Sequence, residues 1–162
     1  GIRRTFQQGR VIEDMSVGDY LTFAAGQPLD SAAVEEILDF FACPSPETVV
    51  ASIDVATRRL VEVAGCFASK PSIVLLDEPG AGLAESESAR LARSISEAPS
   101  RFGCGILLIE HDMEIVRGTC EVLTVLDFGS VISHGDTTEV LADPAVIAAY
   151  LGTSTESIAA TS

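Results

Sequence analysis

A chain of 162 residues is the size of one ordinary domain and can bury a hydrophobic core without disulfides or a structural metal. The formal net charge of −14 repels phosphate backbones and anionic lipid, which argues against nucleic acid as a partner. Hydrophobic residues make up 47% of the chain, but their longest runs are far too short to cross a bilayer. The four cysteines show no CxxC spacing, which favours free thiols in a reducing cytosol.

The first 70 residues are predicted to be mainly helical. Three segments carry apolar residues at helical spacing, two of them behind a residue that can cap a helix. The expected helices cover residues 16–25, 30–44 and 55–69. Ser16 is the candidate cap of the first helix, and Asp30 or Ser31 of the second.

From residue 71 onward, the pattern alternates between strand and helix. Residues 72–77 and 104–112 are near-continuous apolar runs, typical of parallel strands buried on both faces. Residues 85–102 between them read as the crossover helix, so the fold class is α/β. A hairpin that turns at residues 128–130 and two short helices split at residues 143–144 are expected to follow.

Three parts are therefore expected along the chain. The first is a helical part, the second is an α/β part with the hairpin and the last helices, and the third is a flexible tail. Their expected ranges are 1–70, 71–152 and 153–162.

Two adjacent carboxylates, Asp77 and Glu78, close the predicted strand 72–77. Open α/β sheets bind ligands at the carboxyl ends of their strands. Two acids there can divide the work, with Asp77 holding a hydrated magnesium ion and Glu78 orienting and polarising a water molecule. The alternative is that both acids only cap the following turn.

Several ordered motifs resemble those of ATP-binding-cassette (ABC) ATPases. "IVLLDEP" (73–79) resembles their Walker B strand, and "LLIEHDM" (107–113) resembles their histidine switch, with His111 at the switch position. "RTFQQGRVIEDMSVGDYL" (4–21) is similar to the Q-loop region, with Gln7 at the glutamine position. Residues 125–152 resemble the C-terminal hairpin and helices of the branched-chain, hydrophobic amino-acid uptake type.

The resemblance implies a P-loop NTPase fold, here a helical subdomain and the C-terminal half of the parallel-sheet core. It also implies ATP and Mg²⁺ as cofactors. By this resemblance Asp77 binds magnesium, Glu78 activates the attacking water and Gln7 contacts the metal or the water. His111 would contact the γ-phosphate, where an imidazole N–H can stabilise developing charge.

The phosphate-binding Walker A loop of the family, G-x-x-x-x-G-K-[ST], does not occur in this sequence. The single lysine, Lys70, has no glycine-rich loop before it. Because the family places this loop ahead of the Q-loop, the chain is expected to be the portion from the Q-loop onward. Taken alone, this portion is expected to be inactive and to bind nucleotide feebly.

The signature motif of the family, LSGGQ, also differs here. The matching residues are Ile53, Asp54, Val55, Ala56 and Thr57. They contain no glycine to let backbone N–H groups approach phosphate, and Asp54 adds like charge. The D-loop keeps Gly82 and Leu83 but has Ala84 where an acid or amide is usual.

Arg58 and Arg59, which follow the signature segment, allow two interpretations. They either belong to the motif, or they are surface charges that face solvent or pair with the acidic helix before them.

The expected function is that of the ATP-hydrolysing subunit of an ABC importer, for branched-chain amino acids by resemblance. Its expected partners are a second ATPase subunit, identical or not, and membrane permease subunits, on the cytoplasmic face of the membrane. Self-association of the isolated segment is also expected. Two alternatives are a non-catalytic pseudo-ATPase module that serves assembly, and a DNA-repair or chromosome ATPase, which the acidic charge disfavours.

Overall fold

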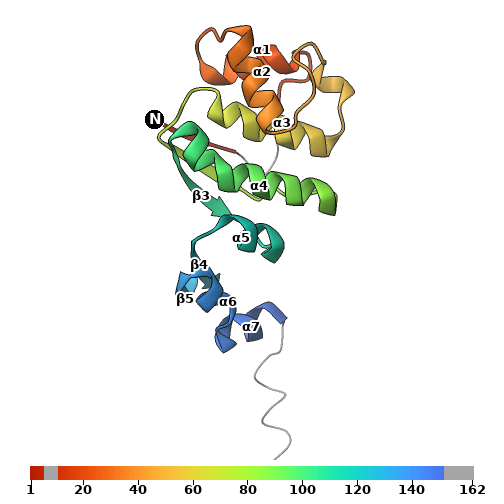
Figure 1. Ribbon diagram of the computed structural model, residues 1–162. Coiled ribbons are helices and arrows are strands. Elements are labelled where there is room, and N and C mark those ends of the chain that lie inside the picture. Colours follow the sequence, from red (N-terminus) through yellow and green to blue (C-terminus); the bar gives the residue numbers. More distant parts are fainter. Residues whose placement is uncertain (6–10, 152–162) are drawn as a thin grey trace, which may run out of the picture. The chain divides into compact units, whose positions relative to one another are not determined.

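The structure, a computed structural model, describes residues 1–5 and 11–151 and forms two compact units (Figure 1). The first unit runs from Gly1 to Thr119, and the second begins at Cys120. The predicted boundary after residue 70 falls inside the first unit and stays a prediction. The predicted tail lies outside the described residues. Among the described residues, no helix combines the length and apolar character that a membrane crossing needs.

Within residues 1–5 and 11–70, the helical part of the first unit contains three α-helices and one short 3₁₀ helix. Their bounds are α1 Val17–Ala25, α2 Ser31–Phe40, η1 Val50–Ser52 and α3 Val55–Phe67. Ser16 caps α1, since its hydroxyl accepts a hydrogen bond from the Asp19 N–H at 3.1 Å. Asp30, rather than Ser31, caps α2, since its carboxylate accepts from the Ala33 N–H at 2.7 Å. The three predicted helices are confirmed.

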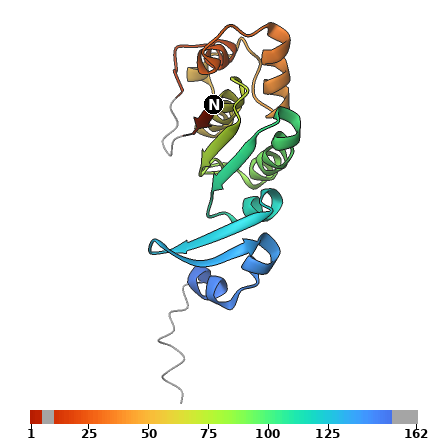
Figure 2. The same ribbon diagram turned by 90° about the vertical axis from the view of Figure 1, so that its left-hand side faces the viewer.

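A three-stranded parallel sheet and two further helices form the rest of the described part of the first unit (Figure 2). Its strands lie in the order β1 (Ile2–Arg4), β2 (Ile73–Asp77) and β3 (Gly105–Ile109). The predicted crossover helix is α4 (Glu85–Phe102), and α5 (Met113–Thr119) follows β3. The pairing of β2 with β3 runs from Ile73 opposite Gly105 to Asp77 opposite Ile109, so the two strands end level.

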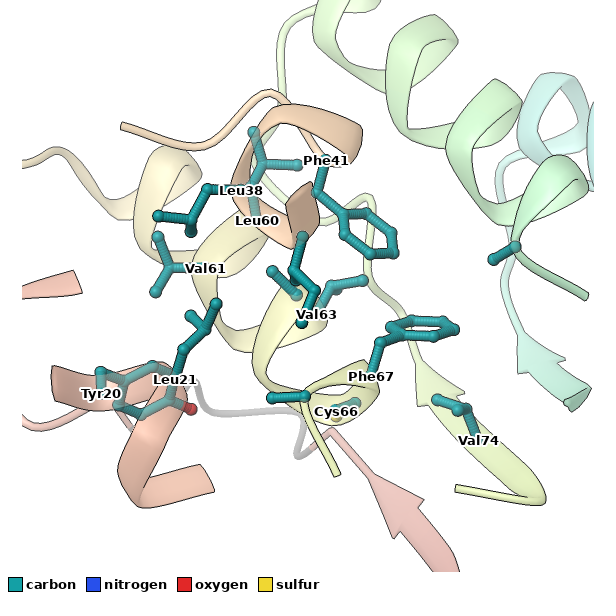
Figure 3. Close-up of a cluster of buried hydrophobic side chains, with 14 of the residues drawn as sticks. Tyr20, Leu21, Leu38, Phe41, Leu60, Val61, Val63, Cys66, Phe67 and Val74 are labelled. Atoms are coloured by element: carbon teal, nitrogen blue, oxygen red, sulfur yellow. The ribbon is translucent and has the colours of Figure 1, made fainter. Parts of the chain in front are cut away.

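The hydrophobic core lies between the helices and one face of the sheet (Figure 3). Phe41, the C-cap of α2, and Phe67 from α3 pack with ring centroids 4.9 Å apart, beside the buried Val74 of β2. A fully buried side chain of this size stabilises the fold by roughly 1.5–3 kcal/mol. This core fixes α3 against β2, which carries the paired acids at its end.

The opposite face of the sheet is exposed, and here the prediction of strands buried on both faces is wrong. Val74 and Leu76 are buried beneath the helices, but Leu107 and Ile109 of β3 are 59% and 58% exposed. Side chains alternate along a strand, so one face of each strand meets the core and the other does not. The helices of the first unit cover only the face that bears Val74 and Leu76.

The second unit contains the predicted hairpin and two short helices. Their bounds are β4 Val122–Asp127, β5 Ser130–Asp136, α6 Thr137–Leu141 and α7 Pro144–Leu151. Phe128 and Gly129 form the hairpin turn with φ of 44° and 81°, which is the geometry of a primed turn. Asp143 separates the two helices, and its carboxylate accepts hydrogen bonds from the Ala145 N–H and the Ser133 hydroxyl.

Candidate active site at the ends of β2 and β3

The ends of β2 and β3 bring the predicted acids and the predicted histidine together. Glu78 directly follows β2, and its N–H donates to the carbonyl of Ile109, the last residue of β3, at 2.8 Å. His111 comes two residues after Ile109. Because the two parallel strands end level, the residues that follow them meet at one edge of the sheet.

The imidazole of His111 lies beside the carboxylate of Glu78. Nδ1 of His111 is 3.3 Å from Oε1 of Glu78, and the two side chains are 74% and 31% exposed. Both side chains can therefore be reached from solvent. A carboxylate and an imidazole at this distance can exchange a proton, or both can hydrogen-bond to one water molecule.

Glu78 has a left-handed backbone, with φ of 46°. Residues with a Cβ rarely adopt this region, and holding one there costs on the order of 1 kcal/mol. Such strain persists only where the surrounding structure enforces it. The backbone at Glu78 is therefore held by its neighbours in a conformation that the free chain would avoid.

Arg59 of α3 supplies part of that constraint. One guanidinium nitrogen donates to the carbonyl oxygens of Asp77 at 2.7 Å and of Glu78 at 3.1 Å. A second nitrogen donates to Glu62 at 2.8 Å, and both side chains of this ion pair are buried. Arg59 thus joins α3, the helix that begins within the signature segment, directly to the backbone that carries the two acids.

The surface interpretation of the paired arginines is therefore wrong for Arg59, because this side chain is buried against the end of β2. Arg58 lies nearer the surface and pairs with Glu13 at 2.5 Å, not with the acidic helix α2. Sequence reasoning missed the role of Arg59 because two adjacent arginines point to different sides of a helix, and only the packing of α3 decides which side is inside.

Asp77 ends β2 with a half-buried side chain. Its N–H donates to the hydroxyl of the fully buried Thr5 at 2.9 Å, which ties β2 to the segment after β1. Gln7, the predicted Q-loop residue, lies outside the described residues. Within the described part of the chain, no group of three or more potential metal ligands occurs. One carboxylate at a strand end still fits magnesium, which commonly takes one or two carboxylates and completes its shell with water and phosphate oxygens.

The signature segment meets the N-terminus of α3. Asp54 caps this helix, and its carboxylate accepts hydrogen bonds from the N–H and the hydroxyl of Thr57 at 2.8 and 3.0 Å. The hydrogen bond from the Thr57 N–H, with that from its hydroxyl, lowers the pKa of Asp54 below its usual value. A helix N-terminus attracts anions, and here the chain's own carboxylate occupies it.

The D-loop connects β2 to α4. Gly82 has φ of 82°, a conformation that glycine adopts without strain, and Leu83 packs against the core. Ala84 stands at the N-cap of α4 and offers no side-chain acceptor. The carboxylate of Glu87 instead accepts from the Ala84 N–H at 2.9 Å.

Sequence reasoning also missed Glu110, which lies inside the "LLIEHDM" motif but was given no role there. Its side chain is 1% exposed, and it accepts hydrogen bonds from backbone groups on both loops of the site. The available signal in the sequence was a charged residue directly after an apolar strand. That signal does not show whether the carboxylate is buried, because burial depends on the tertiary structure.

Comparison with solved structures gives the class of this protein. The chain is similar to the ADP conformation of MJ1267, an ATP-binding cassette of an ABC transporter, with a TM-score of 0.74 and 25% identity. This match covers 94% of the chain and 68% of that structure. A dimeric post-hydrolysis structure of the cassette MJ0796, bound to ADP and phosphate, shares the fold with a TM-score of 0.71 and 18% identity. The fold is that of an ABC ATPase cassette of the P-loop NTPase class.

Comparison with curated proteins gives the family. The chain is 32% identical to the high-affinity branched-chain amino acid transport ATP-binding protein LivG of Salmonella typhimurium, over 94% of the chain and 68% of LivG. It is 31% identical to BraF of Pseudomonas aeruginosa, a protein of the same description, with the same coverage. The family described as branched-chain amino acid ATP-binding cassette transporter matches residues 130–155. The chain belongs to this family of ABC transporter ATP-binding proteins.

Proposed function

We propose that this chain supplies the water-activating and metal-binding side of the ATP site in an importer for branched-chain amino acids. Asp77 would bind Mg²⁺ and Glu78 would act as the general base. His111 would donate a hydrogen bond to the γ-phosphate, and Gln7 would contact the metal or the water. The observation that carries the proposal is the 3.3 Å approach of Glu78 to His111 at the strand ends.

Each residue has a chemical part that fits its position. Mg²⁺ neutralises charge on the phosphates, and Asp77 lies at the strand end where a hydrated ion is accessible. Glu78 can accept the proton of the attacking water, while the imidazole of His111 can hydrogen-bond to the phosphoryl oxygens on which charge develops. The degenerate signature and the D-loop would face a second ATPase subunit. The permease would hold the assembly at the cytoplasmic face of the membrane.

The test is ATP hydrolysis by the ATPase subunit that carries these residues, assembled with its transporter. Glu78→Gln keeps the size of the side chain but removes the base, so we expect turnover to fall by about a hundredfold or more while Mg-ATP still binds. Glu114→Gln, at an exposed acid on α5, is the matched control and should keep normal turnover.

A non-catalytic role in assembly remains the second candidate. The Asp54 cap on α3 and the bare N-cap at Ala84 favour it, because both weaken the surface that would complete a partner's ATP site. Equal turnover of the Glu78→Gln variant and the unsubstituted protein would select this candidate over the first.

A further inference from the structure

Glu110 is a buried charge at the edge of the site. It follows β3 directly, and its side chain is 1% exposed. Burying a carboxylate is costly unless hydrogen bonds replace the water that it loses. The contacts of this side chain therefore indicate what its position stabilises.

The two oxygens of Glu110 bind two different loops. Oε1 accepts a hydrogen bond from the N–H of Gly80, in the loop after β2, at 2.9 Å. Oε2 accepts from the N–H groups of His111 and Asp112, in the loop after β3, at 3.1 and 3.4 Å. One carboxylate thus bridges the backbones on which Glu78 and His111 are carried.

The space around Gly80 leaves little room for a side chain beside this bridge. A Cβ atom at this position would lie 3.0 Å from Oε1 of Glu110 and 2.3 Å from Cδ1 of Ile115. A side chain at residue 80 would therefore crowd Ile115 first and the carboxylate of Glu110 next, and glycine lets the loop after β2 lie close to both.

We propose that Glu110 is a positioning residue that fixes the loop after β2 against the loop after β3, and so sets the distance between Glu78 and His111. The inference rests on the roles proposed above for those two residues. Glu110 itself does not reach the reacting atoms, because its carboxylate is enclosed and spent on backbone N–H groups. Oε2 of Glu110 is 3.9 Å from Nδ1 of His111, whereas Oε1 of Glu78 is 3.3 Å from the same nitrogen.

The bridge lies close in sequence to both Glu78 and His111, so small movements of the two loops would displace these side chains. Glu78 is two residues before Gly80, and His111 is the residue after Glu110. Release of either half of the bridge would free one loop to move relative to the other. Misplacement of a reacting group by about 1 Å can cost on the order of a hundredfold in rate.

Glu110→Gln tests the proposal, since it keeps the shape of the side chain but places an amide NH₂ group against a backbone N–H donor. In the ATPase subunit that carries these residues, assembled with its transporter, we expect kcat for ATP hydrolysis to fall by about tenfold or more with KM within about twofold of normal. Hydrogen–deuterium exchange of residues 79–84 should rise in the same variant. Glu114→Gln, a nearby exposed acid, should change neither quantity.

Gly80→Ala provides a second variant in which Glu110 is intact, in case Glu110→Gln fails to fold by circular dichroism. It should lower kcat in the same way and raise exchange across the bridge, at residues 110–113. Normal kcat or unchanged exchange in folded variants would overturn the inference, as would an equal effect of Glu114→Gln.

Glu78→Gln in the same assays separates this inference from the proposed function. Normal hydrolysis by Glu78→Gln would refute the proposed function alone, because the exchange measurements would still decide whether Glu110 joins the two loops. A loss of hydrolysis in Glu78→Gln, with normal kcat and exchange in Glu110→Gln, would refute only the role given to Glu110.

Discussion

Arg59 shows at the residue scale how the acids of the site are held. Its guanidinium group joins the carbonyl oxygens of Asp77 and Glu78 to the buried carboxylate of Glu62. Charge-assisted hydrogen bonds of this kind are stronger than neutral ones, and burial makes them costly to break. The strained backbone of Glu78 therefore depends on a side chain from α3, the helix that precedes β2 in the chain.

We expect Arg59→Met to destabilise the fold by about 3–5 kcal/mol, because the variant keeps the length of the side chain but leaves the buried Glu62 without this cation. Urea unfolding followed by circular dichroism measures the change. Arg58→Met is the matched control and should cost less than Arg59→Met, since its ion pair with Glu13 is nearer the surface and no buried carboxylate loses a partner. The double variant Arg59→Met, Glu62→Leu should regain part of the loss, and equal effects of the two single arginine variants would contradict this account.

At the scale of elements, α3 is both the support of the site and the carrier of the signature segment. Its apolar residues pack in the core, Arg59 reaches the end of β2, and its N-terminus is closed by Asp54. A cap of this kind satisfies a backbone N–H that would otherwise lack a partner in the helix. Asp54, which departs from the family motif, thus stabilises α3 locally in addition to adding a negative charge.

The Asp54 cap predicts a pH dependence of stability. The pKa of Asp54 is lowered in the folded state, so its contribution is present above the usual value of 3.8 and is lost as pH falls through the lowered folded pKa. We expect Asp54→Ala to lower the urea midpoint at pH 7 and to differ little from the unsubstituted chain at strongly acidic pH.

Asp54→Ser is the control for this prediction, because serine keeps the cap without the titrating charge. Its midpoint at pH 7 should lie closer to that of the unsubstituted chain than the midpoint of Asp54→Ala does. A midpoint difference for Asp54→Ala that persists undiminished at low pH would count against an ionised cap.

At the scale of the whole molecule, the first unit has one covered and one exposed sheet face. The exposed face carries large apolar side chains from all three of its strands. They are Ile2, Ile73, Leu107 and Ile109. An apolar face of this kind, beside strand edges that can accept further pairing, favours association with other protein surfaces.

We therefore expect the 162-residue chain to self-associate, with an average mass in light scattering that rises with protein concentration. The double variant Leu107→Lys, Ile109→Lys should reduce this rise, because it places two charges on the exposed face without disturbing the core. Phe23→Lys, at an exposed position of α1, is the control and should leave association unchanged. A constant monomer mass over a wide concentration range would contradict the prediction.

Most of the elements and the identity of the paired acids could be read from the sequence, because apolar periodicity and capping residues are local properties, whereas the short β1, η1 and α5 were not predicted. The helix caps at Ser16 and Asp30 and the hairpin turn at Phe128 are of this kind. Burial of Arg59 and Glu110 could not be read in this way, because it depends on which elements pack around each charge. The sequence by itself determined the strand that delivers Asp77 and Glu78. Only the tertiary structure decided that two buried charges hold the loops of the site, since residues distant in the chain meet there through packing.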